Sequence, residues 1–312
     1  MTDAPPWLTQ AWQNLLKRQT QHALPHALLI TGNKGIGKLS LARAFSKRLL
    51  CKMKKACGHC HACTLFDCGH HADFFYVAPQ EHGQIKIDQI RQLTEALSQT
   101  AQQGGYRVVI IQEAHTLNTA AGNALLKTLE EPGAQTLLML LTDSAAWLSA
   151  TLRSRCQLLT LRTEKIAALA WLMEQGLSQE RAQYFFEASE AAPLLALTLS
   201  QSDYLLEREA MINTLSQVVK GELSVVAAAS VCLEKPLDDT LNLFQLIVMD
   251  LIRVKTDLPV FENKSLPLLS EHFSLAHLFS CYDKACLFRQ HIKSHLNLNA
   301  TLLLENLFLA VS

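Results

Sequence analysis

The chain has 312 residues with 28 basic and 28 acidic side chains, so its formal net charge is zero, and 49% of its residues are hydrophobic. This hydrophobic content predicts a folded core and excludes a disordered chain. A protein that binds DNA tightly by itself usually carries an excess of positive charge, so we expect any DNA contact of this chain to be weak or shared with partners.

The N-terminal segment MTDAPPWLTQAW contains an acidic residue, two prolines and two tryptophans. It lacks the basic start and apolar run of a signal peptide, and no apolar stretch reaches the roughly 18 residues of a membrane-spanning helix. The number of cysteines, nine, is odd, and four of them cluster with the spacing of a metal site. This pattern favours a reducing compartment over a disulfide framework, so we expect a cytoplasmic protein with no membrane contact.

The first half of the chain alternates short β-rich runs with helical segments. The predicted strands are His26–Thr31, Phe74–Pro79, Arg107–Gln112 and Thr136–Thr142. The predicted helices are Leu39–Leu50, Gln89–Leu97 and Thr119–Glu131. Asp88 is the expected N-cap of the second helix, after an extended Ile85–Ile87, and Pro132 ends the third. Buried strands separated by helices predict an α/β domain, with a parallel sheet and helices on both faces.

From about Thr163 onward the chain has few β-rich runs and many helical Leu, Ala, Glu and Gln segments, so we expect an all-helical second half with a break near residues 201–203. The predicted helices there include Ile166–Glu174, Gln179–Ala188 and Leu241–Val254. The last segment, Asn297–Val311, is expected to place Leu298, Leu302, Phe308 and Leu309 on one broad face.

The segment GNKGIGKL, residues 32–39, follows a predicted strand and opens a predicted helix. Backbone N–H groups in such a loop can hold phosphates, and a lysine adds a positive charge. The residues of this candidate phosphate loop are Gly32, Gly35, Gly37 and Lys38. The full pattern needs Ser or Thr next, because its hydroxyl ligates Mg²⁺, but this chain has Leu39. Ser40 lies about 100° further around the helix and cannot simply replace it.

A second loss lies at the end of VVIIQEAH, where an aspartate should hold Mg²⁺. This chain has the neutral Gln112 there, although Glu113 is retained at the position that often polarises the attacking water. Losing both Mg²⁺-positioning side chains weakens charge neutralisation at the transferring phosphate, so we expect no efficient hydrolysis. ATP binding without hydrolysis stays open, as does the alternative that the glycines only form a tight strand-to-helix turn.

Four cysteines form the pattern Cys51-x5-Cys57-x2-Cys60-x2-Cys63. Four thiolates in so short a span can wrap a tetrahedral Zn²⁺, and no vacant ligand position is implied, so we expect a structural zinc site. Substitution of one ligand by Cys68 or by a nearby histidine stays open, as does the alternative of reduced thiols without metal. The nearby histidines are His59, His61, His70 and His71.

The tripeptide Ser154-Arg155-Cys156 follows a predicted helical turn near the end of the α/β region. Alone, such an arginine indicates a surface salt bridge, but the order of motifs along the chain changes this interpretation. Phosphate loop, cysteine cluster, VVIIQEAH, NTAAGNALLKTLEEPGAQT and a strand ending in Thr142 precede it. With Trp7 and Trp12 before HALLIT and NLNATLLLENLFL near the C-terminus, this order resembles the clamp-loader family of AAA+ ATPases, most closely the delta-prime subunits of bacterial DNA polymerase III.

The resemblance covers nearly the whole chain and implies a role for the tripeptide. In the clamp-loader family this arginine reaches across a subunit interface to the γ-phosphate of ATP held by a neighbour. Arg155 would then be an arginine finger acting in trans, flanked by Ser154 and Cys156, and a planar cation there stabilises charge on the transferring phosphoryl group. Thr142 matches the sensor-1 position, whereas Leu194 stands where active motor subunits have the sensor-2 arginine.

The resemblance also implies a domain organisation. Residues 1–162 would form an AAA+ domain with a zinc-binding insertion at 51–63, residues 163–205 a small helical lid, and residues 206–312 a helical collar that packs against neighbouring subunits. The expected partners are ATPase subunits of the gamma/tau type and a delta subunit in a hetero-pentamer. That complex loads the sliding clamp onto primed DNA, and this chain would be a subunit of the DNA polymerase holoenzyme without enzymatic activity of its own.

Two alternatives come from other functional classes. The chain could be an active gamma/tau-type ATPase, but Leu39, Gln112 and Leu194 argue against it. It could also be a zinc-dependent nucleic-acid-binding module, but the neutral charge and the lack of a basic-aromatic patch argue against that.

Overall fold

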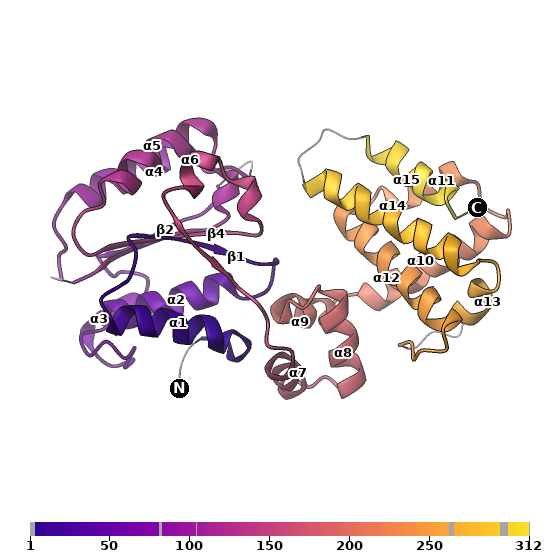
Figure 1. Cartoon of the computed structure of the whole chain (residues 1–312), viewed down its shortest axis with the longest axis horizontal. Helices are drawn as coiled ribbons and strands as arrows, with labels where there is room; N and C mark the ends of the chain where they lie inside the picture. The colour runs from indigo at the N-terminus through magenta and orange to yellow at the C-terminus, as the bar shows by residue number, and fades with distance from the viewer. Residues whose placement is uncertain (1–3, 81–82, 104, 262–264, 294–298, 312) are drawn as a thin grey trace. The chain divides into compact units, whose positions relative to one another are not determined.

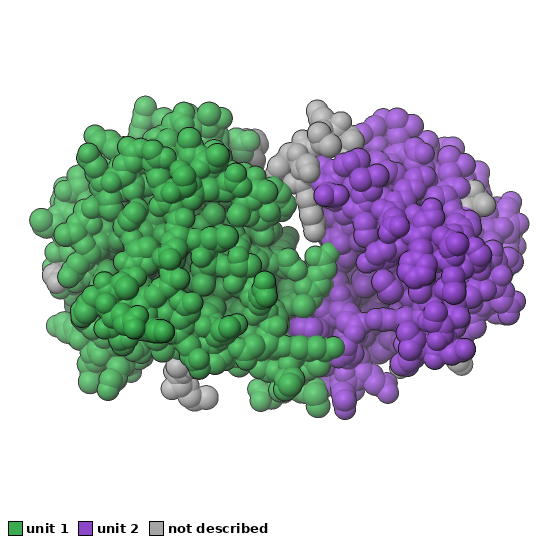
Figure 2. Space-filling model, viewed as in Figure 1, with its two compact units in different colours: residues 1–176, 190–195 green, residues 177–189, 196–312 purple. Residues whose placement is uncertain are grey.

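The computed structural model describes residues 4–311 apart from 81–82, 104, 262–264 and 294–298. Contacts within the chain define two compact units, residues 1–176 with 190–195 and residues 177–189 with 196–312 (Figure 2). The first unit contains the described strands, and the second is helical. This division differs from the three domains expected from the sequence, whose boundaries at 163 and 206 stay a prediction.

The first unit is built on a five-stranded parallel sheet with the order β2-β3-β4-β1-β5. The strands are β1 (Ala27–Thr31), β2 (Phe74–Val77), β3 (Arg107–Ile111), β4 (Thr136–Thr142) and β5 (Gln157–Thr160). Every residue of β1, β3 and β4 is buried, as expected for central strands covered on both faces. The predicted parallel α/β architecture is therefore confirmed.

Helices cover both faces of this sheet, with α1, α2 and α3 on one side and α4, α5 and α6 on the other (Figure 1). The helices of the first unit, with 3-10 helices labelled η, are η1 (Pro6–Leu8), α1 (Thr9–Thr20), α2 (Lys38–Leu50), α3 (His61–Asp67), α4 (Ile87–Ser98), η3 (Ala114–Thr116), α5 (Thr119–Glu130), η4 (Ala145–Trp147), α6 (Ala150–Arg153) and α7 (Lys165–Glu174). Alternate strand residues such as Leu29, Val109 and Leu138 share one buried cluster with Ile90 of α4 and Leu125 of α5. Because successive side chains of a strand point to opposite faces of the sheet, each buried strand contributes apolar side chains to the core on both sides.

The strand register brings three loops to one edge of the sheet. Thr31 at the end of β1 pairs with Thr142 at the end of β4, and Ile111 at the end of β3 pairs with Leu140. Because parallel strands end on the same side, the loops after β1, β3 and β4 meet there. The candidate phosphate loop and Gln112 therefore lie at the same edge.

The two opening tryptophans belong to the core of the first unit. Trp7 donates a hydrogen bond from Nε1 to the Ile36 carbonyl at 2.7 Å, and its ring lies 4.7 Å from that of Trp171 in α7. Trp12 packs edge-on against Phe45 of α2 at 6.1 Å. These contacts fasten the N-terminal segment to the loop that follows β1.

The second unit is helical, and α12 runs through its core with Leu241, Phe244, Ile247 and Leu251 buried. Its elements are α8 (Gln179–Ala188), α10 (Tyr204–Val219), α11 (Val225–Cys232), α12 (Leu237–Lys255), α13 (Leu266–Ser270), α14 (Leu275–Lys293) and α15 (Ala300–Leu309), while α9 (Pro193–Gln201) begins in the first unit. None of the helices in the described ranges has both the length and the apolar character needed to cross a membrane.

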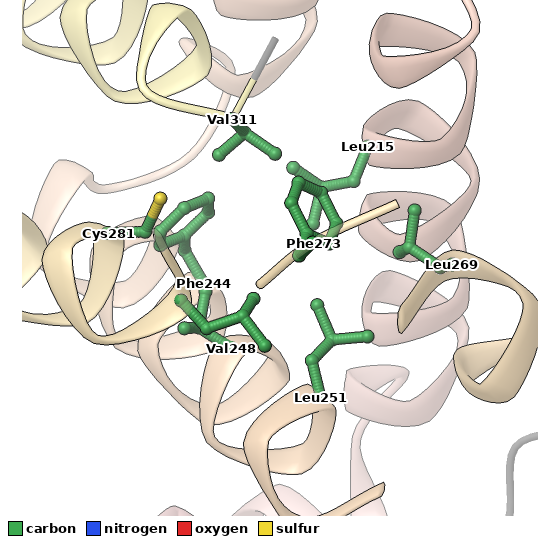
Figure 3. A pocket seen from close by; sticks show the side chains of 9 residues that line it. Leu215, Phe244, Val248, Leu251, Leu269, Phe273, Cys281 and Val311 are labelled. Atoms are coloured by element: carbon green, nitrogen blue, oxygen red, sulfur yellow. The ribbon is translucent and has the colours of Figure 1, made fainter. Parts of the chain in front are cut away.

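A small apolar cavity of about 10 Å³ lies inside this helical unit. Side chains from several helices point toward it, as Figure 3 shows. They are Leu215, Phe244, Val248, Leu251, Leu269, Phe273, Leu278, Cys281 and Val311. A space of this size without polar groups holds no ordered water or ligand, so we interpret it as a packing gap in the core.

Two local predictions around α4 are wrong, and one strand is missing from the prediction. Ile87 is the first residue of α4 and Lys86 is its N-cap, so Asp88 lies in the first turn and Ile85–Ile87 is not uniformly extended. There, Asp88 still complements the helix dipole. Strand β5 was not predicted, because three of its four side chains are exposed at the edge of the sheet and give no buried apolar run.

The predicted face of the last helix is also wrong. Leu302 and Leu309 are exposed whereas Phe308 is fully buried, because residues six apart point to different sides of an α-helix. Leu304 and Leu307 join Phe308 in the core instead. The predicted positions Asn297 and Leu298 lie outside the described residues.

A buried ion pair connects α10 and α12. Arg208 Nη2 lies 2.8 Å from Asp250 Oδ2, and each side chain is only 3% exposed. Asp250 also contacts Arg253, which in turn pairs with Glu187 of α8 at 2.6 Å. Burial raises the pKa of Asp250, although the hydrogen bond and the charge of Arg208 oppose this. This network of ion pairs connects α8, α10 and α12, and the charge of each arginine is compensated by a carboxylate.

Replacing Asp250 by alanine should therefore destabilise the chain strongly. Asp250→Ala leaves the Arg208 charge buried and without its carboxylate, a loss of about 3–5 kcal/mol in the free energy of unfolding measured by urea denaturation. Lys235→Ala is the matched control, since Lys235 forms a half-exposed pair with Glu207 at 2.8 Å, and its loss should be below about 1 kcal/mol. Equal losses for the two variants would contradict this interpretation.

Candidate functional site

The candidate phosphate loop joins the end of β1 to the start of α2, as the sequence predicts. Gly35 and Gly37 have φ angles of 80° and 102°, conformations that favour glycine over other residues. Gly37 precedes Lys38, the first residue of α2, so the backbone N–H groups of the first helical turn lie at the loop. This local geometry is the strand–loop–helix arrangement that phosphate binding requires.

Lys38 is engaged by its own chain. Its Nζ lies 2.5 Å from Asp143 Oδ1 and donates hydrogen bonds to the carbonyls of Gly32 at 2.5 Å and Asn33 at 3.0 Å. Asp143 follows β4 directly, and its carboxylate offers the lysine the negative charge that a phosphate would bring. The phosphate of a nucleotide would have to displace this carboxylate before it could pair with Lys38.

Other segments of the first unit pack against the same loop. Leu194 donates its backbone N–H to the Gly35 carbonyl at 3.1 Å, and Asn33 Nδ2 donates to the Glu190 carbonyl at 2.9 Å. A Cβ atom on Gly35 would lie 2.5 Å from Leu195 Cβ, so only glycine allows this approach. Beside these contacts lies an open hollow of about 430 Å³, which includes Gly32, Asp143 and Ala191 among its lining residues.

The polar side chains at the carboxyl ends of β3 and β4 are bonded to other groups of the chain. Gln112 accepts a hydrogen bond from the Tyr76 hydroxyl, and its amide lies 3.4 Å from Glu113 Oε1. Thr142, the last residue of β4, is 1% exposed, donates to the Ser144 carbonyl at 3.0 Å and lies 3.2 Å from His115 Nδ1. The neutral Gln112 amide thus stands at the end of β3, where the sequence pattern predicts a carboxylate for Mg²⁺.

Arg155 lies just after α6, on the path from α6 to β5. Its Nε and Nη2 donate to Glu130 Oε1 at 2.9 and 2.5 Å, and its Nη1 donates to the Thr151 carbonyl at 3.0 Å. About a third of the side chain, 34%, remains exposed. The guanidinium is therefore held in one place while still accessible from outside the chain.

The two neighbours of Arg155 support its position in different ways. Ser154 is the C-cap of α6, and its hydroxyl donates to the Thr151 carbonyl at 3.0 Å and lies 3.4 Å from Arg155 Nη1. Cys156 packs against the buried apolar cluster, and burial raises the pKa of its thiol to about 11. The cysteine stays protonated near neutral pH, so it anchors the backbone and does not act as a nucleophile.

The four clustered cysteines lie between α2 and the first turn of α3, and their sulfur atoms are all within 4.8 Å of one another. Cys51 Sγ is 3.6 Å from Cys57 Sγ and 3.9 Å from Cys60 Sγ. Four thiolates about 2.3 Å from a tetrahedral zinc would be about 3.8 Å apart, so the observed spacing fits such an ion.

The cluster contains thiols with opposite pKa shifts, since burial raises the pKa of Cys63 to about 12 whereas the surroundings of Cys51 favour its thiolate. Burial acts to raise its pKa, but backbone hydrogen bonds from Cys57, Lys55 and Met53 outweigh this and lower the pKa to about 6. The group that could hold a metal contains none of the alternatives considered from the sequence, and Cys68 is exposed. The four predicted cysteines are therefore placed so that they could hold a metal ion.

Known families match both halves of the chain. A family model described as DNA polymerase III, delta subunit, covers residues 7–165, and a second model, for the C-terminal part of the delta subunit, covers residues 202–312. The DNA polymerase III subunit delta' of Escherichia coli strain K12 is 33% identical over 98% of this chain and 94% of its own length. The chain belongs to the delta-prime family of DNA polymerase III subunits.

Other members of the delta-prime family match as well. The subunit from Pseudomonas aeruginosa is 33% identical over 98% of this chain and 97% of its own length. Among solved structures, a DNA polymerase III gamma subunit-related protein from Thermotoga maritima is 17% identical, covers 96% of this chain and 98% of its own, and has a TM-score of 0.47. At that distance it adds nothing to the family assignment.

The structure adds three residues that sequence reasoning about this delta-prime chain missed. Asp143 neutralises Lys38, Glu130 holds Arg155, and Tyr76 donates to Gln112. Glu130 stands in the LEEP tract that supports the family resemblance, and Asp143 directly follows Thr142, but neither position in the sequence indicates a partner. The contacts arise only when distant segments meet in the fold.

Proposed function

We propose that this chain is a non-hydrolysing subunit of the DNA polymerase III clamp loader and supplies Arg155 as an arginine finger to ATP held by a neighbouring subunit. The family assignment supports the clamp-loader role. The observation that carries the division of labour is the different environment of the two cations. Lys38 is paired with Asp143 inside the chain, whereas Arg155 is held by Glu130 and remains accessible.

Three residues explain why the chain's own nucleotide site would not hydrolyse ATP, each for a different reason. Leu39 has no hydroxyl for Mg²⁺, Gln112 has no charge for it, and Leu194 replaces the sensor-2 arginine. Gly32, Gly35, Gly37 and Lys38 keep the phosphate-loop backbone, with nucleotide binding opposed by Asp143. Transfer of a phosphoryl group depends on metal and cation placement, so a site without these groups gives no efficient hydrolysis.

The remaining assignments complete the proposal. Residues 1–162 act as the AAA+ domain, 163–205 as the lid and 206–312 as the collar that joins neighbouring subunits. The partners are gamma/tau-type ATPase subunits and a delta subunit in a hetero-pentamer, with the sliding clamp and primed DNA reached through that complex in the cytoplasm. Zn²⁺ bound by Cys51, Cys57, Cys60 and Cys63 has a structural role.

The finger is tested by Arg155→Ala in the reconstituted complex. Assembly should survive, because Arg155 forms a partly exposed ion pair of little stabilising effect, whereas ATP hydrolysis at the adjacent subunit should fall by roughly 10³. The measurement is pre-steady-state ATP hydrolysis together with clamp loading on primed DNA. Arg153→Ala removes a nearby arginine of the same helix end and should leave both unchanged. Wild-type hydrolysis and loading in Arg155→Ala would contradict the assignment.

Zinc is tested by elemental analysis of the purified chain. About one equivalent of zinc per chain is expected, and a Cys57→Ser/Cys60→Ser double variant should lose it because two tetrahedral ligands disappear. Cys68→Ser is the matched control, since this exposed cysteine lies outside the cluster, and it should keep the metal. Zinc-free wild-type protein prepared under reducing conditions would overturn the assignment.

A further inference from the structure

We infer that Glu130 is a positioning residue for Arg155, orienting the guanidinium so that its outer edge can meet a phosphate in the neighbouring subunit. This inference rests on the proposed function of Arg155 as an arginine finger. It concerns a residue that touches neither ATP nor the reacting atoms, and it assigns a reason for the ion pair that Glu130 and Arg155 form.

The hydrogen-bond pattern of the guanidinium supports an orienting role. An arginine presents two edges that can each hold a planar anion, one formed by Nε and a terminal nitrogen and one by the two terminal nitrogens. Glu130 Oε1 occupies the first edge, with 2.9 Å to Nε and 2.5 Å to Nη2. Nη1 donates to the Thr151 carbonyl at 3.0 Å and lies 3.4 Å from Ser154 Oγ. Because each terminal nitrogen carries two N–H groups, the second N–H of Nη2 remains for a phosphate while Glu130 keeps its place.

Both residues stand on elements that the core holds in place. Glu130 is the last residue of α5, and Arg155 follows α6 by two residues. Leu129 and Leu152, one in each helix, are buried in the same apolar cluster, and Cys156 packs against it. A contact between two fixed elements sets the direction of the arginine more narrowly than a flexible side chain would.

Stability does not account for this pair. The side chains are 34% and 51% exposed, and exposed ion pairs contribute little to folding. An acidic side chain in the last turn of a helix also faces the negative end of the helix dipole, which is unfavourable. Glu130 therefore weakens the end of α5 slightly, and its benefit lies in the arginine that it holds.

Glu130 could either neutralise the charge of Arg155 or orient its guanidinium, and the two roles have opposite consequences for the rate of ATP hydrolysis. A carboxylate that only neutralised the arginine would lower its attraction for phosphate, and its removal would speed the reaction. A carboxylate that orients the arginine contributes to a near-attack geometry, and its removal slows the reaction even though the net positive charge at the finger rises. The contacts of the guanidinium favour the second role, because Glu130 and Thr151 fix its plane while the second N–H of Nη2 remains for the phosphate.

The test compares Glu130→Ala and Glu130→Gln with Glu131→Ala in the reconstituted complex. Glu131 is the neighbouring exposed carboxylate, so it controls for loss of charge at the same end of α5. At the site that receives Arg155, the kcat for ATP should fall about tenfold in Glu130→Ala and about threefold in Glu130→Gln, whose amide oxygen still accepts from Nε and Nη2. KM should change little, and Glu131→Ala should match wild type.

The outcomes distinguish this inference from the proposed function. If Arg155→Ala lowers hydrolysis while Glu130→Ala and Glu130→Gln retain the wild-type kcat, the inference is wrong and the finger stands. A higher kcat in Glu130→Ala also overturns it, because Glu130 would then restrain the arginine. If Arg155→Ala itself has no effect, the proposed function fails first. If Glu130→Ala does not assemble, Glu130→Gln decides alone, with an unchanged kcat counting against the inference.

Discussion

The ion pair between Lys38 and Asp143 determines whether the candidate phosphate loop can offer a positive charge to a nucleotide. It exists because the sheet order places β1 beside β4 with their carboxyl ends level, so the loop after one strand meets the loop after the other. The lysine that would attract a phosphate is already neutralised by a carboxylate at 2.5 Å. The chain therefore retains the backbone of a phosphate loop, but the lysine of that loop is paired with a carboxylate of the same chain.

The second cation of the chain has the opposite arrangement. Arg155 also has an acidic partner, but its side chain remains partly exposed at the surface. The ion pairs of Lys38 and Arg155 thus suit opposite roles, one closing the chain's own site and one preparing a group for another subunit. Under the proposed function, the chain contributes to ATP hydrolysis through a neighbouring subunit.

The sequence predicts the central fold well, because buried strands give continuous apolar runs. Strands β1, β3 and β4 were predicted to within a residue at each end, and so was the loop from β1 to α2. Strand β5 escaped prediction because its side chains are mostly exposed. In the site, the cysteine cluster is local in sequence and was predictable, whereas the partners Asp143 and Glu130 lie 105 and 25 residues from their cations. These pairs meet only when the first unit is folded.

The central claim, that the chain's own site is idle while its arginine acts elsewhere, is tested most directly by Lys38→Ala in the assembled complex. The measurement is ATP hydrolysis and clamp loading by complexes with wild-type or variant chain, after gel filtration confirms equal assembly. The account predicts equal rates, because Lys38 is paired with Asp143 and serves no reacting phosphate. A fall in hydrolysis comparable to the loss of an active ATPase site would contradict it and show that this chain turns over ATP itself.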